Sequence, residues 1–423
     1  MDEAEIVGVK ADPYAALRFS EFRNFLGMRF FVTIAVQIQS VVIGWHIYQL
    51  THDALSLGLI GLTEAVPALG LALFAGHFAD NMDRKKIITW IIWGEILSTI
   101  ILLIATYPKL QTYYPVFWQI VVLYFMIFFN GVFRGFYSPT VSAMIAKLIP
   151  REVYPNSTTW NATGFQLGAI LGPAMGGLIF GFWGITPAFI TILFSNILSL
   201  ILCRNLVSRP SEAVKKYESI FDSLREGIRF VFNTKMMLSA LSLDLFSVFF
   251  GGAVALLPVF AQDILHVGPK GLGYLRAAPS IGALLTMIFM AYQSPTKKAW
   301  RNLMIAVLGF GLATLLFGFS GNFYLSIFAL FLTGVFDSVS VIIRSTIMQL
   351  LTPDEIRGRV SAVNTMFIGS SNEIGAFESG VSARLLGGAV QSVVFGGAMV
   401  LLVVGYTYTR TKDLLKLNLH TQK

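Results

Sequence analysis

The 423-residue sequence has few charged residues and a single cysteine. Only 13% of its residues are charged, whereas soluble globular proteins carry about 25%. This deficit excludes a soluble enzyme as a class. The lone Cys203 cannot form an internal disulfide, and we expect it to be a packing residue at a helix end.

Motifs for nucleotide hydrolysis and metal binding are also absent. The sequence has no G-x-x-x-x-G-K-[ST] phosphate loop, which argues against ATP hydrolysis by this chain. It has no H-E-x-x-H motif and no paired Cys/His cluster, so we expect neither a metal site nor another cofactor. Residues 1–20 are mixed and charged, which predicts no cleavable signal peptide.

Apolar residues dominate what is present. They make up 55% of the chain, the mean hydropathy is +0.69, and 36 residues are phenylalanine. The long apolar stretches predict an all-α polytopic membrane protein with about 12 transmembrane helices. The expected spans are 25–50, 55–79, 87–107, 115–148, 157–182 and 187–206, followed by 236–260, 271–292, 301–319, 323–350, 360–384 and 387–409.

Polar stretches divide this chain and orient it. The net charge is +8, and Lys and Arg lie almost entirely in alternate loops, which is a topology signal and requires no nucleic-acid partner. The positive-inside rule then places both termini in the cytoplasm. The expected parts are an amphipathic lead-in at 1–24, a six-helix bundle at 25–206, a cytoplasmic linker with an amphipathic helix at 207–235, a second six-helix bundle at 236–409, and a cytoplasmic tail at 410–423.

An internal repeat supports two related halves. The sequence F-F-N-G-V-F at Phe128–Phe133 aligns with F-L-T-G-V-F at Phe331–Phe336. A second match pairs Gly61–Gly70 with Gly273–Gly282, so the second span corresponds to the eighth and the fourth to the tenth. Because an even number of spans separates the copies, the two pseudo-symmetric bundles should insert in the same sense.

The short loop between the second and third spans carries a recognisable pattern. Its residues Gly76, Asp80, Arg84 and Lys85 match the signature G-x-L-A-D-R-x-G-R-K, with departures at Asn81 and Asp83. On this motif the chain resembles the major facilitator superfamily, and it is similar to the branch that contains the enterobactin exporter and macrolide efflux proteins. The resemblance implies that Asp80 forms a cytoplasmic latch with the eleventh helix, near Arg359. The alternative is a solvated basic turn that only sets topology.

The fifth span contains G-A-I-L-G-P-A-M-G-G, which is similar to the antiporter motif of that superfamily. Small residues four apart clear one face of a helix, so that another helix can approach closely. The resemblance implies a contact between halves that seals the cytoplasmic side, whereas the alternative is static packing. The residues concerned are Gly168, Gly172, Pro173, Gly176 and Gly177.

Ionisable residues inside the spans are the strongest site candidates, because charges within a membrane are costly and usually face a cavity or a partner. Arg134 and Asp337 occupy equivalent repeat positions, so we expect them to pair or to contact substrate. Asp244 is the leading acid for proton coupling, with a structural ion pair as its alternative. The full set is Glu64, Glu95, Arg134, Asp244, Arg276, Asp337, Arg344, Glu373 and Glu378, and the last two compete with Asp244.

These patterns predict a secondary active exporter of an amphipathic small molecule, such as a siderophore or a drug-like compound, in a bacterial cytoplasmic membrane. The two halves would rock about a midplane site, and proton antiport would supply the energy. Lipid, substrate and protons are the expected partners, and the protein is expected to be a monomer. The alternatives are a lysophospholipid or lipid flippase and a nutrient importer or facilitator.

Overall fold

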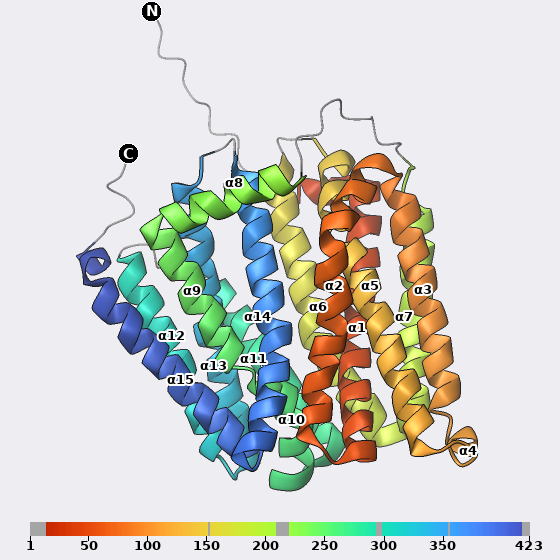
Figure 1. The fold of residues 1–423 in the computed structure, drawn as a ribbon. Helices are drawn as coiled ribbons and strands as arrows, with labels where there is room; N and C mark the ends of the chain where they lie inside the picture. The colour runs from red at the N-terminus through yellow and green to blue at the C-terminus, as the bar shows by residue number, and fades with distance from the viewer. Residues whose placement is uncertain (1–13, 151–152, 209–219, 293–297, 354–355, 417–423) are drawn as a thin grey trace, which may run out of the picture.

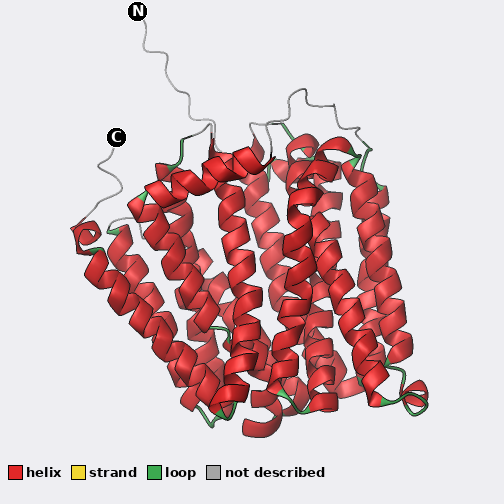
Figure 2. Ribbon diagram, viewed as in Figure 1, coloured by secondary structure: helices red, strands yellow, loops and turns green. Residues whose placement is uncertain are grey.

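A computed structural model describes residues 14–150, 153–208, 220–292, 298–353 and 356–416. Helix is the only regular secondary structure over these ranges (Figure 2). Eleven described helices are long and apolar enough to cross a membrane. A twelfth long helix, α14 (Arg357–Leu386), is more polar but packs inside the same bundle. The predicted all-α polytopic class is therefore confirmed.

The first seven helices pack mainly against one another and are called the N-terminal group. Within it α1 contacts α6 and α7, α2 contacts α5, and α3 contacts α5 and α7. The bounds are α1 (Ser20–Thr51), α2 (Ala54–Asn81), α3 (Arg84–Ala105), α4 (Pro108–Gln111), α5 (Val116–Leu148), α6 (Tyr154–Trp183) and α7 (Ile185–Arg204), after a 3₁₀ turn at Ala16–Arg18.

The remaining helices form the C-terminal group. Here α11 and α12 both contact α13, while α15 contacts α9, α12 and α14. The bounds are α8 (Ile220–Asn233), α9 (Lys235–Phe250), α10 (Leu257–Val259), α11 (Gly268–Tyr292), α12 (Ala299–Phe319), α13 (Phe323–Leu351), α14 and α15 (Ala389–Arg410). The expected seventh span is irregular in its second half, because α9 ends at Phe250 and short 3₁₀, α and π turns continue to Ile264.

Most of the contact between the groups is made by two helix pairs, α2 with α14 and α6 with α11. We call the side on which α1 begins and α15 ends the termini side, and the side that carries α4 the opposite side (Figure 1). The exact domain boundaries expected from the sequence stay a prediction.

The internal repeat corresponds to matched contacts in space. A side chain at Gly131 on α5 would collide with the carbonyl oxygen of Glu64 on α2. At the equivalent position, a side chain at Gly334 on α13 would collide with the carbonyl of Pro279 on α11. The repeat also relates two contacts of an aromatic ring with a glycine, Phe133 on Gly94 and Phe336 on Gly309. Close helix approach at glycine thus occurs at equivalent places in both groups.

An apolar core joins the two groups on the opposite side. Trp45, Tyr48 and Leu57, from the end of α1 and the start of α2, share one buried cluster with Phe260 and Leu272. The other described clusters each stay within one group. The structure is therefore closed between the groups on the opposite side.

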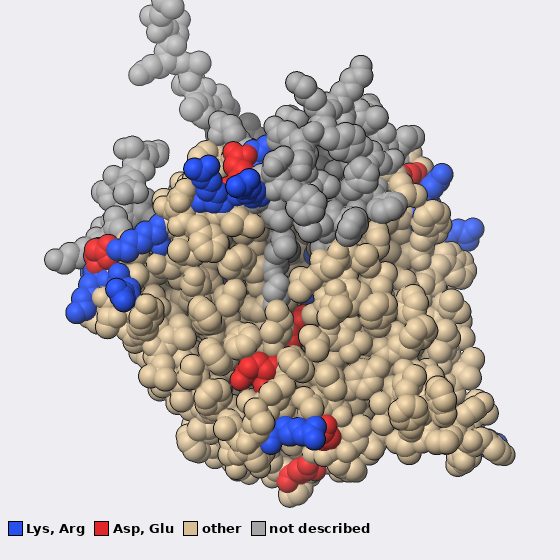
Figure 3. All heavy atoms as spheres, viewed as in Figure 1, with Lys and Arg blue, Asp and Glu red and all other residues tan. Residues whose placement is uncertain are grey.

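Helix α8 occupies the second part of the expected linker and lies across the termini side (Figure 1). Val231 packs against Val360 and Val363, and Glu226 forms an ion pair with Arg359 of α14. Basic side chains gather on this side in Figure 3, whereas the broad middle of the same face is mostly uncharged. That distribution suits a bundle whose middle lies in the membrane and whose basic termini side is in contact with water.

We predict that Gly334→Ala and Gly131→Ala each destabilise the protein, by about 1–3 kcal/mol, because the added methyl group forces two helix backbones apart. The unfolding midpoint of the purified protein in detergent measures this. Gly70→Ala is the control, because a side chain there has no neighbouring atom within 4 Å. Equal midpoints for all three variants would contradict the close-approach interpretation.

Candidate functional site

A cavity of about 710 Å³ lies between the two groups. Its wall contains residues of α1, α2, α3, α5 and α6 on one side and of α9, α11, α12, α13 and α14 on the other. Cavities of this size are typical of small-molecule sites. Much of the wall is apolar, and its acidic and basic residues are Arg29, Glu64, Glu95, Arg134, Arg276, Asp337 and Glu373.

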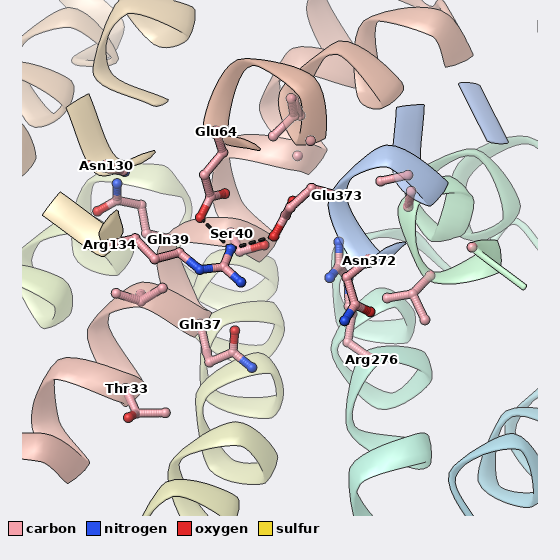
Figure 4. Close-up of a pocket in the computed structure, with 18 of the residues that line it drawn as sticks. Thr33, Gln37, Gln39, Ser40, Glu64, Asn130, Arg134, Arg276, Asn372 and Glu373 are labelled. Atoms are coloured by element: carbon pink, nitrogen blue, oxygen red, sulfur yellow. Dashed lines mark hydrogen bonds and ion pairs between the residues drawn. The ribbon is translucent and has the colours of Figure 1, made fainter. Parts of the chain in front are cut away.

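Arg134 joins the two groups at this cavity. Its Nη1 atom donates to Glu64 Oε1 at 2.8 Å and also to Glu373 Oε1 (Figure 4). Arg134 and Glu64 come from α5 and α2, whereas Glu373 comes from α14 of the other group. The predicted pair of Arg134 with Asp337 is not formed in this structure, although Asp337 lines the same cavity from α13.

Glycines one turn away explain how these charges meet. Gly131 precedes Arg134 by about one turn and lies directly against the backbone of Glu64. Gly61 precedes Glu64 by about one turn, and a Cβ atom there would lie 2.8 Å from the carbonyl oxygen of Glu373. Three helix backbones therefore converge, which brings three charged side chains within reach of one another. The sequence supplied both glycines, but not the neighbours that they contact.

Asp244 and Arg344 form a separate ion pair. They connect α9 with α13, both within the C-terminal group, and their side chains are only 6% and 5% exposed. Neither residue lines the large cavity. A small recess beside Asp244 is also lined by Asp337, which thus lies between the buried pair and the cavity. The geometry fits the structural alternative that the sequence left open for Asp244.

Glu378 lies on α14 but does not line the cavity, whereas Glu373 on the same helix does. Of the acids predicted for proton coupling, Glu373 alone lines the large cavity and also contacts a charged residue of the other group.

The charged loop between α2 and α3 is described in part. The Asp83 side chain accepts from the Lys85 backbone N–H at 2.9 Å and so caps α3. The Lys85 ammonium donates to the Arg204 carbonyl at 2.9 Å, which ties the start of α3 to the end of α7. Arg84 begins α3. The side chains of residues 72–81 lie outside the described residues, so a latch involving Gly76 and Asp80 stays a prediction.

The glycine motif on α6 has two kinds of neighbour. Side chains at Gly168, Gly172 and Gly176 would collide with α1, in the same group. A side chain at Gly177 would collide with Gly273 of α11, in the other group. Pro173 lies inside α6. In this structure the first three glycines pack within one group, and Gly177 is an intergroup contact toward the opposite side, so a seal on the cytoplasmic side stays a prediction.

Sequence reasoning missed one polar bridge between the groups. The Tyr48 hydroxyl at the end of α1 donates to Asp263 Oδ2 in the π turn after α10. Gly58 and Gly380 also meet backbone to backbone in the same region. The only hint in the sequence was that Asp263 is an acidic residue between two expected spans, and nothing in the sequence places it beside Tyr48.

The profile of the Major Facilitator Superfamily matches residues 25–376. The chain belongs to this superfamily. It is therefore a multi-pass membrane transporter and not an enzyme. It is 23% identical to the uncharacterized MFS-type transporter YfmI of Bacillus subtilis, over 96% of this chain and 98% of that one. It is 24% identical to the enterobactin exporter EntS of Shigella flexneri, over 87% of this chain and 84% of that one.

Solved transporters share the fold at low sequence identity. A bacterial homologue of the human lysosomal transporter Spinster, in an inward-facing and unoccupied conformation, aligns with a TM-score of 0.70 at 14% identity, over 94% of this chain and 98% of that one. A bacterial homologue of the iron transporter ferroportin, in an inward-facing state, aligns with a TM-score of 0.68 at 15% identity, over 93% and 98%. These likenesses support the fold.

We predict that Tyr48→Phe opens the opposite side more often. A hydrogen bond to a carboxylate contributes about 1 kcal/mol or more, so its loss should shift the equilibrium about fivefold or more. A cysteine at Ser40 in the cavity wall, in a Cys203→Ser background, reports opening through labelling by an impermeant maleimide from that side. Tyr124→Phe is the matched control, because its hydroxyl donates to Ser56 within one group. Equal labelling of both variants would refute the bridge.

We predict that Asp244→Asn reduces stability by about 3–5 kcal/mol, because it leaves the Arg344 charge buried and unpaired. Detergent unfolding midpoints and the monodisperse yield measure the loss, and adding Arg344→Met should recover part of it. Asp413→Asn is the control, since its 2.8 Å ion pair with Lys235 is 59–60% exposed. A stable Asp244→Asn protein without proton coupling would instead restore Asp244 as the coupling acid.

Proposed function

We propose that this chain is a secondary active exporter of an amphipathic small molecule, energised by proton antiport. The observation that carries the proposal is the Arg134 bridge, in which one guanidinium binds a carboxylate from each group at the cavity wall. The relative named as an enterobactin exporter supports export. The cavity, with a largely apolar wall and a few charges, suits an amphipathic substrate.

Ion pairing and protonation of Glu373 exclude each other. A protonated carboxyl has no charge to offer Arg134, so loading a proton removes one attraction between α5 and α14. Glu64 remains beside Arg134 in the same group and keeps the arginine compensated. Protonation of Glu373 would therefore loosen an intergroup contact without leaving a bare cation in the cavity.

The transport cycle follows from this exclusion. With the opposite side closed, Arg134 holds Glu373 and substrate enters from the termini side. Rocking of the groups breaks the pair, exposes Glu373 to the opposite side and lets a proton bind as the substrate leaves. The return movement brings Arg134 back to Glu373, and the new ion pair displaces the proton to the termini side. The tight glycine contacts between the groups would separate and re-form in the same movement.

The basic loops support a cytoplasmic termini side in a bacterial membrane, and the proposed cycle requires only a monomer. The sequence left open lipid flipping and nutrient import, and the direction of transport separates these alternatives from export.

We predict that Glu373→Gln abolishes export. A deletion strain complemented with this variant should show the extracellular metabolites of the deletion strain under iron limitation, whereas wild type restores the missing compound. Glu378→Gln is the matched control on the same helix and should restore export, because Glu378 does not line the cavity. Immunoblots of the membranes check that both variants are present in equal amounts.

Other outcomes identify the alternatives. A compound that accumulates in the medium of the deletion strain would indicate import, and a changed membrane lipid composition with an unchanged medium would indicate lipid flipping. Export that persists in Glu373→Gln would exclude this residue as the coupling acid.

A further inference from the structure

We propose that Arg276 on α11 binds an anionic group of the substrate, so that the transported molecule is an amphipathic anion. This inference rests on the proposed transport function and names the substrate class of the same cavity. Arg276 lines the cavity on the side across from Arg134 (Figure 4). No carboxylate pairs with it among the described residues.

The three arginines of the cavity wall differ in their partners. Arg134 has two carboxylates, and Arg29 donates to the Asn161 side chain and lies 5.6 Å from the centre of the Phe165 ring. The Nε atoms of Arg29 and Arg276 are both buried without an acceptor, but no hydrogen bond or ion pair joins any part of Arg276 to another described residue. A buried guanidinium remains charged and is costly without a partner. Arg276 is thus the cation that a bound anion would stabilise most.

The repeat identifies the partner that Arg276 would have by symmetry. Glu64 on α2 pairs with Arg134 on α5, and the equivalent positions on α11 and α13 carry Arg276 and Asp337, with the charges exchanged. The equivalent pair is not formed in this structure, although Asp337 lines both the large cavity and the recess next to Asp244. At these equivalent positions the N-terminal group has an ion pair, whereas the C-terminal group has an arginine without a partner among the described residues.

The surroundings of Arg276 set the polarity of the molecule that it would bind. Its neighbours Leu275 and Ala278 belong to the apolar core that closes the opposite side. The wall of the same cavity includes the aromatic rings of Phe310 and Phe317. An anionic head would lie at the closed end against Arg276, and an apolar or aromatic body would fill the space next to it.

Binding of two matched probes tests this inference without a proton gradient. Naphthalene-1-sulfonate carries the anionic group, and naphthalene-1-sulfonamide has the same ring system without the charge. Each probe is titrated into the purified protein in detergent, and the rise of the unfolding midpoint with probe concentration yields an apparent affinity. We expect wild type to prefer the sulfonate, and Arg276→Gln to bind it roughly tenfold to hundredfold more weakly with little change for the sulfonamide. Arg276→Lys should recover part of the preference.

Arg29→Gln is the matched control in the same cavity and should keep the preference for the sulfonate. Unchanged sulfonate binding by Arg276→Gln, or loss of the preference in Arg29→Gln instead, would overturn the inference. Either result leaves the coupling test at Glu373 unaffected, because that test measures export in cells. Conversely, export that persists in Glu373→Gln, together with sulfonate binding that depends on Arg276, would refute the proposed cycle and keep the anion site.

Discussion

The cost of charge inside a membrane constrains this structure more than any other factor. A guanidinium or carboxylate in an apolar bundle needs a partner, and the protein meets that need in two ways. Asp244 and Arg344 form a buried pair within one group, which stabilises that group. Arg134 instead shares its charge between Glu64 of its own group and Glu373 of the other. A structural role and a switching role thus arise from the same pairing chemistry, and the difference lies in whether the partners move together.

Glycine contacts determine which charges can meet. Gly61 and Gly131 let α2 approach α14 and α5 so closely that backbone atoms touch. These contacts place three side chains from three helices at one point of the cavity wall, and Gly177 with Gly273 holds the second intergroup contact. Since a cavity between two rigid groups changes shape when the groups rotate, the same contacts that assemble the site also connect it to the conformational change.

The sequence predicted the class of protein, the repeat and most of the charged cavity residues, because each depends on composition or local pattern. Arg134 and Glu373 stood out as ionisable residues in apolar spans, but their pairing did not follow from the pattern. Repeat symmetry suggested Arg134 with Asp337, whereas packing of α14 against α2 brought Glu373 closer. Tyr48 and Asp263 are 215 residues apart, and no local signal relates them. At Asp83 the sequence departs from the superfamily signature of the loop between α2 and α3, and the structure gives a local reason, because the Asp83 side chain caps α3.

By itself the sequence determined that the chain lies in a membrane, that it contains an internal repeat and that ionisable residues lie within its spans, since hydropathy and repetition are properties of the chain alone. Only the tertiary structure decided which charges are paired, which side is closed and that Arg276 has no partner among the described residues. Those facts depend on the distance between helices remote in sequence. The distance is set by small residues on one helix meeting the backbone of another, a match that no single stretch of sequence contains.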